Sequence, residues 1–126
     1  MNTHTITIPA APIELADGEI YAGIILNEDG TPGHHLVLLP GDHDEANWSN
    51  SKEWAASING ELPTRREQSL LFANCKQHFE QDWYWSAEQH ASDASYAWYQ
   101  TFYNGHQYRY HFSNQCRARS VRRLPI

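Results

Sequence analysis

A run of aromatic and imidazole side chains near the end of the chain is the strongest sign of binding chemistry in the sequence. Its members are Tyr99, Tyr103, His106, Tyr108 and Tyr110, with Gln100 and Arg109 between them. Tyrosine offers a large contact area at a small cost in conformational entropy, so it is enriched in binding surfaces. Glutamine and arginine at the margin add hydrogen bonds and a positive charge, and these seven residues are the expected ligand site. The alternative is a well-made aromatic hairpin that the rest of the domain covers.

Other residues that could do chemistry lack the spacing that such chemistry needs. Cys75 and Cys116 are the only cysteines, and no nucleophile–base pair can be read from the sequence around them. The eight histidines do not have the spacing of a recognised zinc site. The acidic loop at 42–45 could hold a cation, but it lacks the glycine and the terminal glutamate of a calcium loop. The sequence therefore predicts a protein that is not an enzyme and that has no metal or cofactor.

Two strands joined at 104–105 are expected to position the tyrosines. The Asn-Gly pair at these positions favours a two-residue hairpin loop, because a type I′ turn needs positive φ at both central residues. Such a loop pairs Tyr99 with Tyr110 and places the five aromatic and imidazole members of the site on one face. Trp98 and Phe102 lie on the other face and are expected to point into the core.

The elements around this hairpin follow from periodicity, caps and turn residues. We expect an edge strand at 4–8, strands at 19–26 and 34–39, helices at 50–58 and 65–79, a strand at 82–87 and a terminal strand at 116–124. The first helix is expected to begin with a capping box at Asn50, and the second with a clearer one formed by Thr64 and Glu67. Arg65 and Arg66 follow in the first helical turn, where positive charge opposes the helix dipole. We therefore expect these two arginines to have a carboxylate partner elsewhere.

Charge is distributed unevenly along the chain. The net charge of −6 divides into −11 for residues 1–93 and +5 for residues 94–126. A basic end would suit nucleic acid, but the chain as a whole is acidic and no nucleic-acid-binding motif accompanies these arginines. We expect the arginines to pair with the acidic first part of the same domain, without nucleic-acid binding.

Length and hydropathy indicate one domain over residues 1–126, with 1–17 as an N-terminal strand and lead-in. No apolar run approaches the roughly 20 residues of a membrane helix, so no membrane insertion is expected. The first residues lack the basic and apolar regions of a signal peptide. The expected location is cytoplasmic on synthesis, unless the protein is exported as part of a larger particle such as a phage virion.

Several short segments, in order, resemble a known family. They are 61–71, Trp83-Tyr84-Trp85-Ser86, Tyr96-Ala97-Trp98, Phe102, Gly105 and 117–124. Together they resemble the family of domains of unknown function typified by the C-terminal domain of the Legionella collagen-like adhesin. The segment 18–23 is similar to the start of small phage and prophage proteins of this family, so the resemblance covers residues 18–124.

The resemblance implies an α+β, C-type-lectin-like fold, in which two helices pack on small twisted antiparallel sheets and the first and last strands meet. The sequence is also similar to the variable proteins of diversity-generating retroelements. Trp98, Phe102 and Gly105 match the scaffold pattern of those proteins. The five aromatic and imidazole members of the expected site then fall on the positions that display ligand-contacting residues.

Two better-known relatives of that fold are not matched. Calcium-dependent lectins carry Glu-Pro-Asn or Gln-Pro-Asp followed by Trp-Asn-Asp, and neither motif occurs here, so sugar binding through calcium is not expected. The formylglycine-generating enzymes act through a cysteine pair. Cys75 and Cys116 have no supporting residues for such chemistry.

The sequence thus predicts a recognition domain of phage or prophage origin that binds a protein or glycan through the aromatic hairpin, in host recognition by a virion and as a homo-oligomer. One alternative is an intracellular phage accessory protein that inhibits a host defence factor through its acidic first part, including 42–45. Another is a structural virion subunit that buries the tyrosines against a neighbour.

Overall fold

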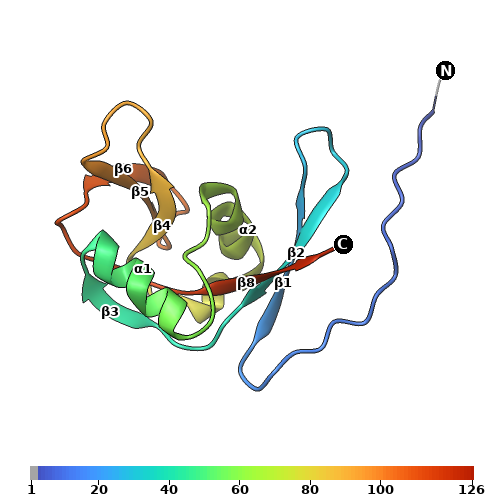
Figure 1. Ribbon diagram of the computed structural model, residues 1–126, viewed down its shortest axis with the longest axis horizontal. Coiled ribbons are helices and arrows are strands. Elements are labelled where there is room, and N and C mark those ends of the chain that lie inside the picture. Colours follow the sequence, from blue (N-terminus) through green and yellow to red (C-terminus); the bar gives the residue numbers. More distant parts are fainter. Residues whose placement is uncertain (1–2) are drawn as a thin grey trace.

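In the described part of the chain, eight strands form two separate sheets, with two α-helices packed beside them (Figure 1). The computed structural model describes residues 3–126. In chain order the elements are β1 (Ile20–Leu26), β2 (Pro32–Leu38), β3 (His43–Ala46), α1 (Trp48–Ser57), α2 (Arg65–Cys75), a 3₁₀ helix (Lys76–His78), β4 (Trp83–Gln89), β5 (Tyr96–Thr101), β6 (Gln107–His111), β7 (Cys116–Ala118) and β8 (Val121–Pro125). The α+β class and the two helices expected from the sequence are confirmed.

The smaller sheet has the strand order β1-β2-β8. Its central strand carries Leu36, Val37 and Leu38, all fully buried. The first and last strands therefore lie in one sheet but do not meet, because β2 runs between them. This differs from the arrangement that the family resemblance implies.

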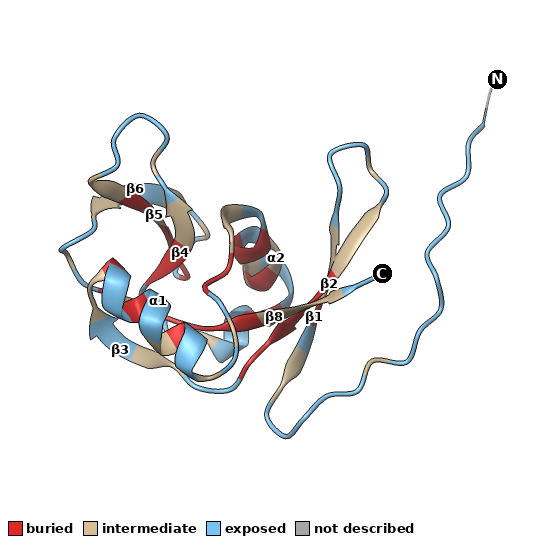
Figure 2. Ribbon diagram, viewed as in Figure 1, coloured by how far each residue is buried: buried red, intermediate tan, exposed pale blue. Residues whose placement is uncertain are grey.

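The larger sheet has the order β3-β7-β4-β5-β6. Its strands pair antiparallel except at one point, where Tyr84 of β4 pairs in parallel with Arg117 of β7. Figure 2 shows that burial is concentrated where α1 and α2 lie against the two sheets, whereas β6 at the end of the larger sheet stays largely accessible. This edge strand is half of the aromatic hairpin.

The N-terminal segment does not form the expected edge strand at 4–8. Residues 3–17 contain no strand, and the segment runs past the smaller sheet without joining it (Figure 1). Ile6 and Ile8 are exposed. The prediction was wrong because alternation is not enough: a strand also needs a neighbour that accepts its backbone hydrogen bonds.

Helix α1 begins at Trp48, two residues earlier than expected, and its cap lies three residues earlier. Its cap is Asn47, whose side chain accepts a hydrogen bond from the Asn50 amide at 2.8 Å, so the capping box predicted at Asn50 is wrong. Asn59 takes a positive φ of 64° directly after the helix, which agrees with the expected end at Asn-Gly. The acidic run before this helix was expected as a loop, but most of it forms β3 beside β7.

Helix α2 begins as expected, since Thr64 and Glu67 form a complete capping box. It ends at Cys75, earlier than expected, and continues as the 3₁₀ helix. Phe79 follows this turn and stacks on Phe102 with ring centroids 3.9 Å apart. This contact anchors the loop side of the aromatic hairpin to the helix end.

The basic end of the chain forms two strands, β7 and β8, where one was expected. Three of its arginines pair with acidic residues of the first part: Arg117 with Asp42 at 3.0 Å, Arg122 with Glu19 at 2.8 Å and Arg123 with Glu67 at 2.7 Å. The predicted internal neutralisation is therefore confirmed for these arginines. In these three ion pairs the arginine charge is balanced within the protein.

Candidate functional site

The aromatic hairpin of β5 and β6 has a longer loop than the Asn-Gly pair predicts. Tyr99 lies opposite Tyr108, whereas the predicted register placed it opposite Tyr110. Because the shift is two residues, the side chains that remain in the paired strands keep their predicted faces, whereas Tyr103 lies on the loop. Asn104 does not have positive φ, so the predicted type I′ turn is wrong.

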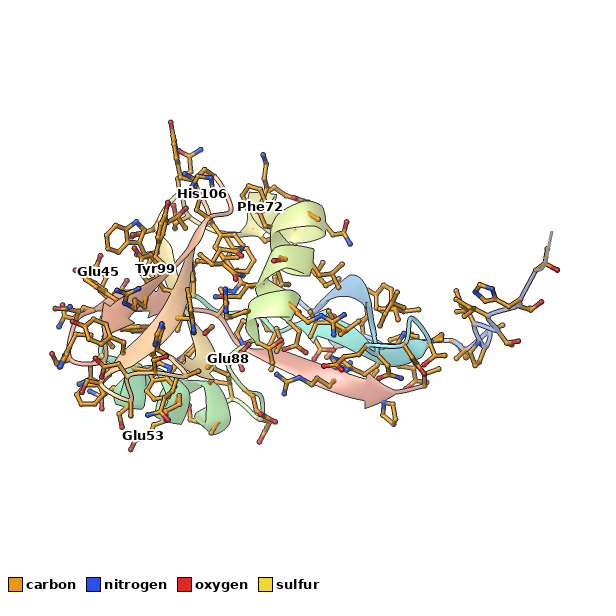
Figure 3. All side chains as sticks on the ribbon, turned by 90° about the horizontal axis from the view of Figure 1, so that it is seen from above. Glu45, Glu53, Phe72, Glu88, Tyr99 and His106 are labelled. Atoms are coloured by element: carbon orange, nitrogen blue, oxygen red, sulfur yellow. The ribbon has the colours of Figure 1, made fainter. Side chains whose placement is uncertain are left out.

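Packing of the loop against α2 explains the longer turn. Phe102 is buried in the core, as expected. A two-residue loop would keep Phe102 in the strand, whereas here it belongs to the loop. Gly105 has a φ of +80° and lies against the Phe72 ring, beside which Figure 3 shows His106. The Asn104 side chain accepts a hydrogen bond from the His106 amide at 3.0 Å. Asn104 thus stabilises the loop through its side chain and not through the positive φ of a type I′ turn.

One face of the hairpin forms a continuous aromatic surface. We define this aromatic surface as Trp83, Tyr99, His106, Tyr108 and Tyr110, with Tyr103 on the adjoining loop. Trp83 stacks on Tyr99 with ring centroids 4.7 Å apart and meets Tyr110 edge-on at 5.3 Å. The Tyr108 ring lies 6.1 Å from Tyr99 and 6.0 Å from His106. Each ring on the strands thus has a neighbouring ring that limits its motion, whereas Tyr103 on the loop is 72% exposed.

Exposure divides the aromatic surface into a floor and a contact layer. Tyr99 is only 6% exposed, so the expectation that it displays its ring to a ligand is wrong. Burial raises the pKa of its hydroxyl. Tyr103, Tyr108 and Trp83 are 72%, 50% and 40% exposed and form the contact layer, while Tyr110 is half-buried. Tyr99 supports the rings that a ligand can reach.

Trp83 was not among the site residues expected from the sequence. It lies on β4, where Thr101 of β5 is its partner in the sheet. The alternation of Trp83 and Trp85 in the sequence indicates one shared face, but not that β4 pairs with β5. That pairing is a tertiary contact, so the periodicity of one strand could not reveal it.

The opposite face of the hairpin joins α2 through a glutamine network. Gln100 is fully buried and donates a hydrogen bond to the Gln68 carbonyl at 2.8 Å. It accepts another from the Gln107 side chain at 2.8 Å. The expected role of Gln100 at the margin of the site is therefore wrong, because its side chain is used within the protein.

Trp98 also differs from its prediction. It is half-buried and not part of the core, and the guanidinium of Arg65 lies 3.6 Å above its ring. Arg65 also donates from Nε to the Gln107 side chain at 3.0 Å. Among the described residues, neither Arg65 nor Arg66 has a carboxylate within 4.0 Å of its guanidinium. The predicted carboxylate partner is thus not found at either guanidinium group within residues 3–126. The Glu88 carboxylate instead accepts a hydrogen bond from the Arg65 backbone amide at 2.7 Å.

Two shallow clefts border Gln107 on this face. One, of about 560 Å³, is lined by residues that include His34, Arg65 and Arg66. The other, of about 510 Å³, is lined by Tyr96, Trp98, Gln107, Tyr108 and Arg109. The second cleft meets the aromatic surface at Tyr108, so β6 presents binding groups on both of its faces.

A buried ion-pair network lies behind the first cleft. Glu67 has no exposed side-chain area and contacts Arg123 and His34, each at 2.7 Å. Burial by itself would raise the pKa of Glu67, but hydrogen bonds from Arg123 and from the Thr64 amide outweigh it and lower the pKa. The carboxylate is therefore held in its charged form. It joins α2 to β2 and β8 and supports the helix end that carries Arg65.

The two cysteines are separate, buried thiols. Cys75 is the last residue of α2 and Cys116 the first residue of β7, and the two belong to different core clusters. Burial raises the pKa of both thiols, which makes them poor nucleophiles. In the part of the chain that the structure describes, no three His, Cys, Asp or Glu side chains come together as metal ligands. None of the helices described is long and apolar enough to cross a membrane.

Comparison of the chain with models of known protein families gives no match, and comparison with curated proteins gives none either. The resemblance of residues 18–124 to the adhesin-domain family stays a prediction. The candidate site therefore rests on the geometry of β4, β5 and β6.

Proposed function

We propose that this protein is a non-enzymatic recognition domain that binds a protein or glycan ligand through its aromatic surface. The observation that carries the proposal is the stacked arrangement of Trp83 on Tyr99, with Tyr108 accessible beside them. Rings held by their neighbours lose little conformational entropy when a ligand binds, so more of the contact energy appears as affinity.

The proposal extends to origin and fold. The family resemblance supports a phage or prophage source, a C-type-lectin-like fold and a role in host recognition by a virion. The two helices and the two small sheets are compatible with that fold. The parallel β4–β7 bridge and the central place of β2 are the points where this chain would depart from it.

The acidic run at 42–45 offers less to a partner than the aromatic surface does. Asp42 accepts hydrogen bonds from Arg117 and from the Tyr84 hydroxyl, so its carboxylate is already engaged. Asp44 and Glu45 are exposed on β3. Exposed carboxylates are well solvated by water. A contiguous exposed aromatic patch is poorly solvated, and such patches mark interaction sites.

The test is capture of a host ligand with matched variants. The wild type and a Tyr103→Ala/Tyr108→Ala variant are used on a glycan array and in pull-downs from host-envelope and lysate fractions. Tyr21→Ala is the control, because Tyr21 is an exposed tyrosine on the smaller sheet. Circular dichroism and thermal melting first establish that all three proteins fold.

A ligand captured by the wild type and by Tyr21→Ala, but not by the double variant, supports recognition through the aromatic surface. Equal capture by all three proteins places the ligand site elsewhere. Self-assembly of the purified wild type that the double variant loses supports the structural virion subunit instead.

A further inference from the structure

We propose that the partner is an extended acidic peptide segment that adds as a new strand to the free edge of β6. This inference rests on the proposed recognition function and chooses a protein ligand over a glycan. A peptide bound at this edge would contact both faces of β6. One is the aromatic face, and the other borders the cleft at Trp98 and Arg109.

The hydrogen-bond pattern shows which backbone groups of β6 are free. The Thr101 amide donates to the His106 carbonyl at 2.9 Å, and the Phe112 amide donates to the Ser95 carbonyl at 2.9 Å. Antiparallel ladders alternate, so residues 106, 108, 110 and 112 bond toward β5, and residues 107, 109 and 111 point their backbone groups outward.

The turn after β6 already uses one of these outward groups. The His111 carbonyl accepts a hydrogen bond from the Asn114 amide at 2.9 Å, as the alternation requires. The backbone amides and carbonyls of Gln107 and Arg109 have no partner among the described residues, and β6 is the last strand of its sheet. Four adjacent donor and acceptor groups are thus available to a peptide strand.

Unpaired positive charge selects the sign of that peptide. Arg117, Arg122 and Arg123 each have a carboxylate partner. In the described part of the chain, by contrast, no carboxylate lies within 4.0 Å of the Arg109 or Arg65 guanidinium, and the Glu88 carboxylate bonds only the Arg65 backbone amide. Arg109 is opposite Trp98 in the sheet, and Arg65 lies over the same tryptophan. Both guanidinium groups therefore lie on the same side of the β5–β6 hairpin.

Arg65 is prepared for a carboxylate before any ligand arrives. Its guanidinium is held by the Trp98 ring and by the Gln107 side chain, and Gln107 is held in turn by the Arg65 carbonyl at 2.7 Å. A planar guanidinium fixed in this way binds a carboxylate with little further loss of freedom. The carboxylate that the sequence led us to expect for Arg65 is, on this proposal, supplied by the partner.

The pleat of the sheet then specifies the pattern of the peptide. Alternate residues of an added strand fall on opposite faces. Acidic residues on one face meet Arg109 and the 510 Å³ cleft, and apolar or aromatic residues on the other meet Tyr108 and Tyr110. A charged residue on an edge strand normally discourages pairing, so only a partner of opposite charge removes that barrier.

The experiment selects peptides from an unbiased display library with the immobilised full-length chain. The expected result is enrichment of acidic residues at every second position, alternating with apolar or aromatic ones. In Arg109→Glu the selected peptide loses affinity at least about tenfold, because like charges then face each other. Lys52→Glu makes the same change in charge on α1 and leaves the affinity unchanged.

A direct readout of strand pairing is amide hydrogen exchange. The amides of Gln107 and Arg109 become protected when the selected peptide binds, and N-methylation of the peptide amides that face β6 abolishes binding. Selected peptides without acidic alternation, equal binding to Arg109→Glu, or unchanged exchange at these two amides would each overturn the proposal.

The outcomes also separate this inference from the proposed function. Peptides that depend on Tyr108 but not on Arg109 leave recognition by the aromatic surface in place and exclude pairing with the β6 edge. If no peptide is selected but a host ligand is captured through Tyr103 and Tyr108, only the edge proposal fails. If neither experiment yields a ligand, both proposals fail.

Discussion

Trp83 and Tyr99 lie almost parallel, with ring centroids 4.7 Å apart and an interplanar angle of 21°. The two residues belong to neighbouring strands, β4 and β5, and Trp83 remains accessible above a tyrosine that is almost fully buried. A stacked pair of this kind turns an exposed indole into a fixed part of a surface. The predictions below begin with this pair.

Replacing the indole should weaken binding more than it weakens the fold. Trp83→Ala removes the stack on Tyr99 and the edge contact with Tyr110, and we expect the free energy of unfolding to fall by about 1 to 2 kcal/mol. Trp83→Tyr keeps an aromatic ring and should retain most of the stability. Urea denaturation measures both variants. A Trp83→Ala protein that binds its captured ligand as tightly as the wild type would remove Trp83 from the site.

Breaking the buried ion pair of Glu67 should destabilise the protein strongly. Glu67→Gln leaves the Arg123 guanidinium with a neutral partner in a buried place, and we expect a loss of about 3 kcal/mol in the free energy of unfolding. Glu61→Gln is the matched control, since Glu61 also contacts Arg123, at 3.2 Å, but is exposed. That variant should lose less than about 1 kcal/mol. Equal losses in denaturant unfolding would show that burial of Glu67 does not matter.

The same carboxylate predicts how stability depends on pH. Because the pKa of Glu67 is lower in the folded protein, its contribution is present above the unfolded value of about 4.3 and is lost as pH falls through the folded value. Thermal melting between pH 7 and pH 3 should show a smaller decrease for Glu67→Gln than for the wild type. Parallel curves for the two proteins would contradict the assignment.

The hairpin loop should not accept a side chain at Gly105. Gly105→Ala combines a positive φ with a Cβ only 2.9 Å from the Phe72 ring. Gly30→Ala is the control, because Gly30 has a similar φ of +86° but nothing within 4 Å of the added Cβ. The control should cost about 1 to 2 kcal/mol from backbone strain alone, and Gly105→Ala should cost more. Equal losses of unfolding free energy in urea denaturation would mean that the Phe72 ring moves aside without an energetic cost.

Local patterns in the sequence determined much of this fold. The capping box of Thr64 and Glu67 and the helix end at Asn59 depend on residues a few positions apart, and both are present in the structure. The side chains of the paired strands β5 and β6 lie on their predicted faces, because the alternation of a strand is a local property. The turn was predicted less well, since Asn-Gly favours a two-residue loop only when no long-range contact competes.

Only the tertiary structure decided which of those side chains a ligand can reach. Phe102 is drawn into the core beside α2, and this lengthens the loop and moves the register by two residues. Tyr99 is buried because Trp83 lies over it from the neighbouring strand β4. The Arg65 guanidinium stacks on Trp98, and no carboxylate of the described residues lies within 4.0 Å of it. Alternation along one strand assigns a side chain to a face, but its exposure depends on what the neighbouring strands and helices place over that face.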